Sequence, residues 1–259
     1  MSVATLHLPS LRGLASSPRR GLVEVATLVG LYGIYELVRG QGNATLPTAR
    51  AHTDEIVALE RHLHLFGERA VQNAAHVLPG LPTLLGAAYI TLHFLGTAVF
   101  LVWLHRRHRE HFPLVRNTLV IATGIALAIY LLYPVAPPRL AGLGMTDAVS
   151  EQSAVALAGH STWFYNPIAA VPSLHFGYAL LVGIALARIA RRRIVRLIGW
   201  IYPAVMLIVI VATGNHFFFD AAAGGIAIAA GFAVASWIGS PTTRGRRWQS
   251  AEGSAAALC

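Results

Sequence analysis

Cysteine, lysine and charge of either sign are scarce in this sequence, and these scarcities exclude several classes of protein. The only cysteine is Cys259, which excludes an intramolecular disulfide framework and a cysteine-based metal site. Lysine does not occur, so all 20 basic residues are arginines. Charged residues make up only 12% of the chain against 55% hydrophobic residues, and the mean hydropathy is +0.58. An ordinary soluble domain is therefore excluded.

The basic charge follows the pattern of membrane topology rather than that of a nucleic-acid-binding surface. The net charge is +9, but the arginines form short clusters between apolar runs. If the N-terminus is inside, the inner segments hold fifteen of the 20 arginines. The five left outside are Arg39, Arg50, Arg61, Arg69 and Arg139. The sequence thus predicts that both termini are cytoplasmic and that the chain binds no nucleic acid.

The apolar runs predict an all-α, polytopic membrane bundle of six transmembrane helices. A helix needs about 20 mainly apolar residues to cross a bilayer. Six runs reach or approach this length: 21–38, 82–104, 117–133, 174–190, 197–213 and 217–238. We expect one membrane domain at 21–239, a cytoplasmic N-terminal tail at 1–20 and a disordered cytoplasmic tail at 240–259.

The segment 48–77 predicts an extracytoplasmic amphipathic helix. Its apolar residues recur at steps of three and four: Ile56, Leu59, Leu63, Phe66 and Ala70. Charged residues fill the other positions: Asp54, Glu55, Glu60, Arg61, Glu68 and Arg69. Thr53 suits the start of this helix, and Pro79 and Pro82 suit its end. The helix lies on the outer membrane surface or against the bundle, where it either closes a loop or covers a site.

His216 and Asp220 are the first candidate functional pair. Four residues apart, they share one face of a helix's first turn if the last crossing begins near His216. The carboxylate can accept the hydrogen of one imidazole nitrogen and leave the lone pair of the other exposed, as a histidine nucleophile or base requires. The alternative is a capping and packing pair. An ionisable pair this close to the hydrocarbon is usually functional.

Two further segments complete the candidate site. The sequence Pro172-Ser173-Leu174-His175 predicts a helix start that can seat an anion, with a hydroxyl donor in Ser173 and a proton donor in His175. Three prolines between residues 134 and 138 hold Arg139 on a stiff segment. The arginine topology places all three segments at the outer ends of their helices. Together they predict phosphoryl transfer without a metal or cofactor.

The order Pro-Pro-Arg139, then Pro-Ser-Leu-His175, then His216-x-x-x-Asp220 resembles the type 2 phosphatidic acid phosphatase superfamily. In particular it resembles the branch with inositolphosphorylceramide synthase and many actinobacterial membrane proteins, from the amphipathic helix to Gly225, including 58–61 and 89–94. The resemblance implies that His216 attacks phosphorus to form a phosphohistidine and that Asp220 orients it. It implies that His175 protonates the departing alcohol and that Arg139 holds the phosphate. It also implies a bacterial plasma membrane and an extracytoplasmic active site.

The chain departs from the superfamily's pattern at two positions. Leu132 stands where a lysine is usual, and Ile210 stands where an arginine is usual. Other groups must then replace these phosphate clamps; the candidates are Arg61, Arg69, His160, Tyr165 and Asn166. His93 is either a satisfied core residue or a pocket residue.

These features predict a membrane lipid phosphatase that hydrolyses a lipid phosphate ester. With an alcohol as acceptor in place of water, the same histidines would make a phosphotransferase that acts on a phospholipid. A proton-coupled transporter, with the histidines as its relay, and an inactive scaffold are the remaining alternatives.

Overall fold

The structure, a computed structural model, describes residues 45–149 and 168–239 together with Gly30 and Gly33. Within these ranges it is helical and has no β-strand, only an isolated parallel bridge between Val135 and Ala169. The all-helical class is therefore confirmed. The predicted first crossing and both predicted tails lie outside the described residues, apart from those two glycines. So do the candidate residues His160, Tyr165 and Asn166.

Among the described residues, four helical runs are long and apolar enough to cross a membrane. The first, Leu81–Arg107, consists of α4 (Leu81–Thr91), the π-helical turn η1 (Leu92–Gly96) and α5 (Thr97–Arg107). The others are α6 (Phe112–Leu132), α9 (Arg193–Ala212) and α10 (Phe218–Gly239). The fifth predicted crossing in the described residues, α8 (Leu174–Ile189), has 16 residues and is shorter than the usual span of about 20. The structure thus supports an integral membrane protein, with four of the six predicted spans.

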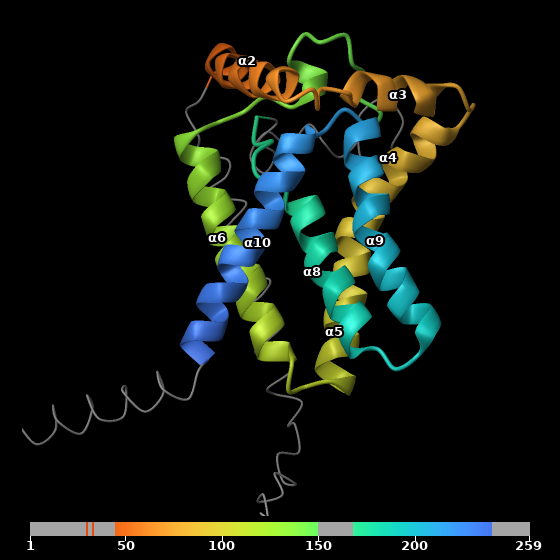
Figure 1. The fold of residues 1–259 in the computed structure, drawn as a ribbon, viewed down its shortest axis with the longest axis vertical. Coiled ribbons are helices and arrows are strands. Elements are labelled where there is room, and N and C mark those ends of the chain that lie inside the picture. The colour runs from red at the N-terminus through yellow and green to blue at the C-terminus, as the bar shows by residue number, and fades with distance from the viewer. Residues whose placement is uncertain (1–29, 31–32, 34–44, 150–167, 240–259) are drawn as a thin grey trace, which may run out of the picture. The chain divides into compact units, whose positions relative to one another are not determined.

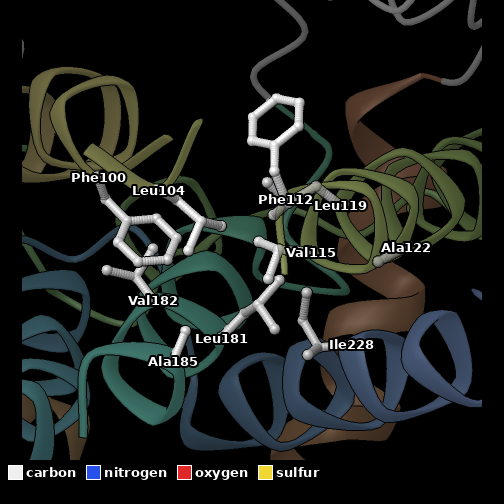
Figure 2. Close-up of a cluster of buried hydrophobic side chains, with 10 residues drawn as sticks. All are labelled: Phe100, Leu104, Phe112, Val115, Leu119, Ala122, Leu181, Val182, Ala185 and Ile228. Atoms are coloured by element: carbon white, nitrogen blue, oxygen red, sulfur yellow. The ribbon is translucent and has the colours of Figure 1, made fainter. Parts of the chain in front are cut away.

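Apolar side chains cover much of the helix surface, as a bilayer requires. Leu132, Ile226 and Trp237 are 82%, 70% and 63% exposed. Such residues would be costly in water but suit contact with lipid. The buried apolar residues meet in the interior instead, where one cluster includes Phe100, Leu104, Phe112, Leu181 and Ile228 (Figure 2).

Helix α8 packs against both α9 and α10, and glycines let the backbones approach closely. A Cβ on Gly199 would lie 2.7 Å from the Gly183 carbonyl oxygen, and a Cβ on Gly183 would lie 2.5 Å from that of Gly199. At the other crossing, Gly224 of α10 leaves no space for a Cβ beside the Ser173 backbone. Small residues at such contacts are typical of membrane helices, whose association depends on close packing. The second contact fixes the start of α8 against α10.

The predicted single amphipathic helix is instead two helices, α2 (Leu46–His62) and α3 (Glu68–His76). They lie across one end of the bundle (Figure 1), and we call them the roof. The helical conformation is interrupted at 63–67, where His64 adopts a positive φ of 56°. The predicted cap at Thr53 is wrong, because Thr45 caps α2 by accepting a hydrogen bond from Thr48 N–H, and Thr53 is buried within the helix.

The predicted apolar stripe does not lie on one packed face of α2. Leu59 and Leu63 are 41% and 52% exposed, whereas Ile56 is buried. The face that packs on the bundle carries Ile56, Val57 and Glu60, all buried. In a membrane an apolar stripe can face lipid, so the polar stripe is free to face protein.

Side chains of α2 attach the roof to the proline-rich segment after α6. Proline has no N–H, so this segment cannot form a regular backbone ladder and its carbonyls need other donors. Arg50 Nε donates to the Leu140 carbonyl at 2.7 Å, and Thr53 Oγ1 donates to the Ala136 carbonyl at 2.9 Å. The Ala136 N–H in turn donates to Thr53 Oγ1 at 3.1 Å. The segment that carries Arg139 is thereby held beneath the roof.

Candidate active site

His216 and Asp220 are in contact at the start of α10. The helix begins at Phe218, so His216 lies in the preceding turn rather than in the first helical turn. Its Nδ1 is 3.1 Å from Asp220 Oδ2, which also accepts a hydrogen bond from Phe217 N–H at 2.9 Å. Asp220 is fully buried and His216 is 5% exposed. With Nδ1 facing the carboxylate, Nε2 is the ring nitrogen left for chemistry.

His175 reaches the same place from α8. Ser173 caps α8 by accepting a hydrogen bond from Phe176 N–H at 3.3 Å, and Ser173 N–H donates to the Asp220 carbonyl at 2.9 Å. This bond joins the starts of α8 and α10. It brings the His175 and His216 ring centroids to 5.8 Å, so the two histidine motifs, 41 residues apart in the sequence, form one cluster. Pro172 precedes the cap instead of occupying the first turn.

Aromatic side chains of α4 and η1 pack on His175. The Tyr89 and His93 rings each stack on it, with centroids 4.0 Å away, and the Tyr89 centroid is 6.4 Å from that of His216. His93 therefore belongs to the histidine cluster, and Tyr178 stacks on it in turn at 5.2 Å. Tyr89 belongs to the segment 89–94 that carries the family resemblance, but the sequence analysis did not name it as a site residue. Its four-residue spacing from His93 on an apolar helix was the available signal.

The π-helical turn η1 lies where His93 enters the site. A π-turn breaks the regular i→i−4 pattern and frequently occurs at functional sites. Here the Tyr202 hydroxyl of α9 donates to the Leu92 carbonyl at 2.8 Å. Gly96 leaves room for this hydroxyl, since a Cβ there would lie 3.1 Å from it. We expect the π-turn and this hydrogen bond to influence the orientation of the His93 ring.

Arg139 is tied to the turn before His216. Its Nε pairs with Asp147 at 2.9 Å, and its Nη1 donates to Asn215 Oδ1 at 2.7 Å. Its backbone N–H donates to the Gly214 carbonyl at 3.0 Å, and its side chain is 5% exposed. Sequence reasoning identified the arginine but neither Asp147 nor Asn215. These contacts give Arg139 a part in shaping the loop that presents His216.

The other predicted phosphate ligands are placed differently. Ser173 is fully buried, and its oxygen accepts the capping bond. The Arg61 guanidinium lies over the Phe66 ring at 5.0 Å, and Arg69 lies beside Gly144. Both arginines are exposed on the roof, and these contacts are with loop residues rather than with the histidines.

Two carboxylates of the roof contact the start of α10, next to the His216–Asp220 pair. Glu60 and Glu68, which occupy charged positions of the predicted amphipathic helix, are 2% and 0% exposed. Both accept hydrogen bonds from backbone N–H groups at the start of α10. In the ranges that the structure describes, no group of three or more potential ligand side chains is arranged to hold a metal ion.

The chain was compared with protein-family models, with curated proteins and with solved structures. Neither of the last two comparisons found a significant match. A family model described as the PAP2 superfamily matches residues 54–234, the region that contains most of the roof, both histidine motifs and Arg139. Because this match covers well over half of the sequence, the chain belongs to the PAP2 superfamily.

Proposed function

We propose that this protein is a lipid phosphatase that hydrolyses a lipid phosphate ester through a phosphohistidine on His216. The superfamily is one of phosphatases and phosphotransferases, and the proposal selects hydrolysis of a lipid substrate within that range. The observation that supports it best is the meeting of His175 with the His216–Asp220 pair beneath the roof.

In the first half of the reaction, His216 Nε2 attacks phosphorus. Asp220 accepts the Nδ1 hydrogen bond, keeps the lone pair on Nε2 and stabilises the positive charge that the ring acquires. The P–O bond to the lipid alcohol breaks, and protonated His175 gives its proton to the departing oxygen. The stacked rings of Tyr89 and His93 hold the His175 ring in place.

In the second half, neutral His175 takes a proton from water as the water oxygen attacks the phosphohistidine. The P–N bond breaks, inorganic phosphate leaves, and His216 and protonated His175 are restored. No metal or cofactor takes part in the proposed reaction. Arg139 is the proposed phosphate ligand, and it acts from a position already fixed by Asp147 and Asn215.

The membrane location and the charge distribution support a site on the extracytoplasmic side. The α5–α6 and α8–α9 connections lie at the end of the bundle opposite the roof in Figure 1. Arginine clusters at these connections and the adjoining helix ends include Arg106, Arg107 and Arg191–Arg193. By the positive-inside rule this charge supports a cytoplasmic position for that end, and so an extracytoplasmic position for the histidines. Their gathering at one end also favours an enzyme over a transporter, which would need ionisable groups at several depths.

The proposal is tested with purified protein in detergent, a panel of lipid phosphates and phospholipids, and a His216→Ala control. Release of inorganic phosphate that needs His216 supports the phosphatase. A new lipid-linked or alcohol-linked phosphodiester in the presence of inositol would instead make the protein a phosphotransferase of the inositolphosphorylceramide synthase type. If no product depends on His216 while the variant folds normally, the phosphohistidine mechanism is wrong.

A further inference from the structure

The first turn of α10 receives three carboxylates, one for each of three successive backbone N–H groups. Phe217 N–H donates to Asp220 at 2.9 Å, as an ordinary local cap would provide. Phe218 N–H donates to Glu68 Oε1 at 3.0 Å, and Phe219 N–H donates to Glu60 Oε1 at 2.7 Å. The last two bonds join residues about 150 positions apart. The roof is therefore hydrogen-bonded to the start of α10, directly after His216.

The two roof carboxyls differ in their remaining contacts. Glu68 Oε2 accepts a second backbone hydrogen bond, from Gly67 N–H at 3.0 Å, so both of its oxygens are acceptors. Glu60 Oε2 is buried, and no N–H or O–H donor in the described ranges reaches it. An oxygen without a donor is the natural place for a proton, which the neighbouring Glu68 carboxylate can accept in a hydrogen bond.

The charges around Glu60 also favour a proton on this side chain. The ionisable groups that act on it are Glu68 on α3 and Asp220 on α10, both acidic. Burial, the hydrogen bond with Glu68 and these like charges raise the pKa of Glu60 to about 8. Three ionised carboxylates at one buried helix end would repel one another, because the helix dipole offers only about half a positive charge. One retained proton removes part of this repulsion.

We propose that Glu60 and Glu68 form a clamp that holds one proton on Glu60 and the negative charge on Glu68, and that this clamp positions His216 and Asp220 for catalysis. Glu60 and Glu68 are positioning residues, since they contact the α10 backbone and not the reacting atoms. The catalytic part of this inference rests on the function proposed above. Its structural part, the protonated Glu60 beside an ionised Glu68, stands independently.

The clamp predicts that replacement by glutamine has different effects on activity at Glu60 and at Glu68. Glutamine resembles a protonated glutamate, so Glu60→Gln can accept from Phe219 N–H and donate to Glu68. Glu68→Gln replaces an acceptor oxygen by an NH₂ group, which cannot accept from Gly67 or from the Glu60 proton. We expect Glu60→Gln to keep kcat within about threefold of the wild type and Glu68→Gln to lose about tenfold or more, with little change in KM, because small displacements of a reacting group are costly.

The experiment compares the wild type with Glu60→Gln, Glu60→Ala and Glu68→Gln, all as full-length protein in detergent. Asp54→Asn is the matched control, because Asp54 is an exposed acid on the same helix α2. For each protein kcat and KM are measured across pH on the best lipid phosphate, and thermal unfolding is recorded. Wild-type activity should fall as pH rises through about 8, and Glu60→Gln should remove that component of the profile.

Infrared difference spectroscopy tests the proton without reference to activity. A protonated carboxyl band should titrate near pH 8 in the wild type and in the His216→Ala variant, and be absent in Glu60→Gln. Equal loss of kcat in both glutamine variants, or an unchanged kcat in Glu68→Gln with lowered thermal stability alone, would overturn the positioning role. A missing carboxyl band would overturn the shared proton. Activity that does not depend on His216 would instead count against the proposed function and leave the infrared result standing.

Discussion

Replacing Asp220 by asparagine removes one charge at the centre of the proposed site and keeps the shape of the side chain. In the wild type Oδ2 accepts from both His216 Nδ1 and Phe217 N–H, and Oδ1 is buried without a donor in the described ranges. The asparagine oxygen can keep the two accepted bonds only by placing its NH₂ group at the Oδ1 position. A buried, unsatisfied NH₂ group costs about 1–3 kcal/mol.

The larger effect is on turnover. Without the carboxylate, the imidazole loses its orienting partner and the charge that stabilises the phosphohistidine, so we expect kcat to fall about 10²- to 10⁴-fold, or about 3–5 kcal/mol of activation free energy. KM should change little, because Asp220 is fully buried and contacts no substrate in the proposed reaction. Steady-state kinetics on a lipid phosphate measure both constants, and thermal unfolding checks the fold. A large rise in KM at unchanged kcat would refute this reasoning and assign Asp220 to substrate binding.

The rate should be bell-shaped in pH, since neutral His216 must attack and protonated His175 must donate; a flat rate would contradict the two-histidine mechanism. Arg139→Lys should lower kcat/KM at least about tenfold, because one ammonium group cannot form both contacts that the guanidinium makes with Asp147 and Asn215. Full activity of this variant would show that these two contacts are dispensable. Gly199→Val should destabilise the α8–α9 crossing and lower the unfolding temperature in detergent, whereas an unchanged temperature would argue against this packing. The folded protein keeps a proton on Glu60 that the unfolded chain loses above about pH 4.5, so unfolding free energy should decrease from there to about pH 8, and Glu60→Gln should flatten this slope.

The sequence alone determined the features that depend on local spacing. Apolar runs identified the described membrane helices, because a bilayer demands a fixed length of apolar chain whatever its neighbours are. The four-residue spacing of His216 and Asp220 anticipated their contact, although His216 lies in the turn before α10 rather than in its first helical turn. The motif order anticipated the PAP2 superfamily.

The tertiary structure decided what depends on which faces meet. Periodicity indicated an amphipathic roof helix on the membrane surface or against the bundle, and the structure shows that Ile56 and Glu60 are buried while Leu59 is 41% exposed. Next to a bilayer, either stripe of such a helix can find a favourable partner, lipid for one and protein for the other, so the pattern does not choose between them. The tertiary structure also decided the ion pair between Asp147 and Arg139 and the stacking of Tyr89 on His175. These contacts join segments far apart in the chain, and only the packing of the helices brings their side chains together.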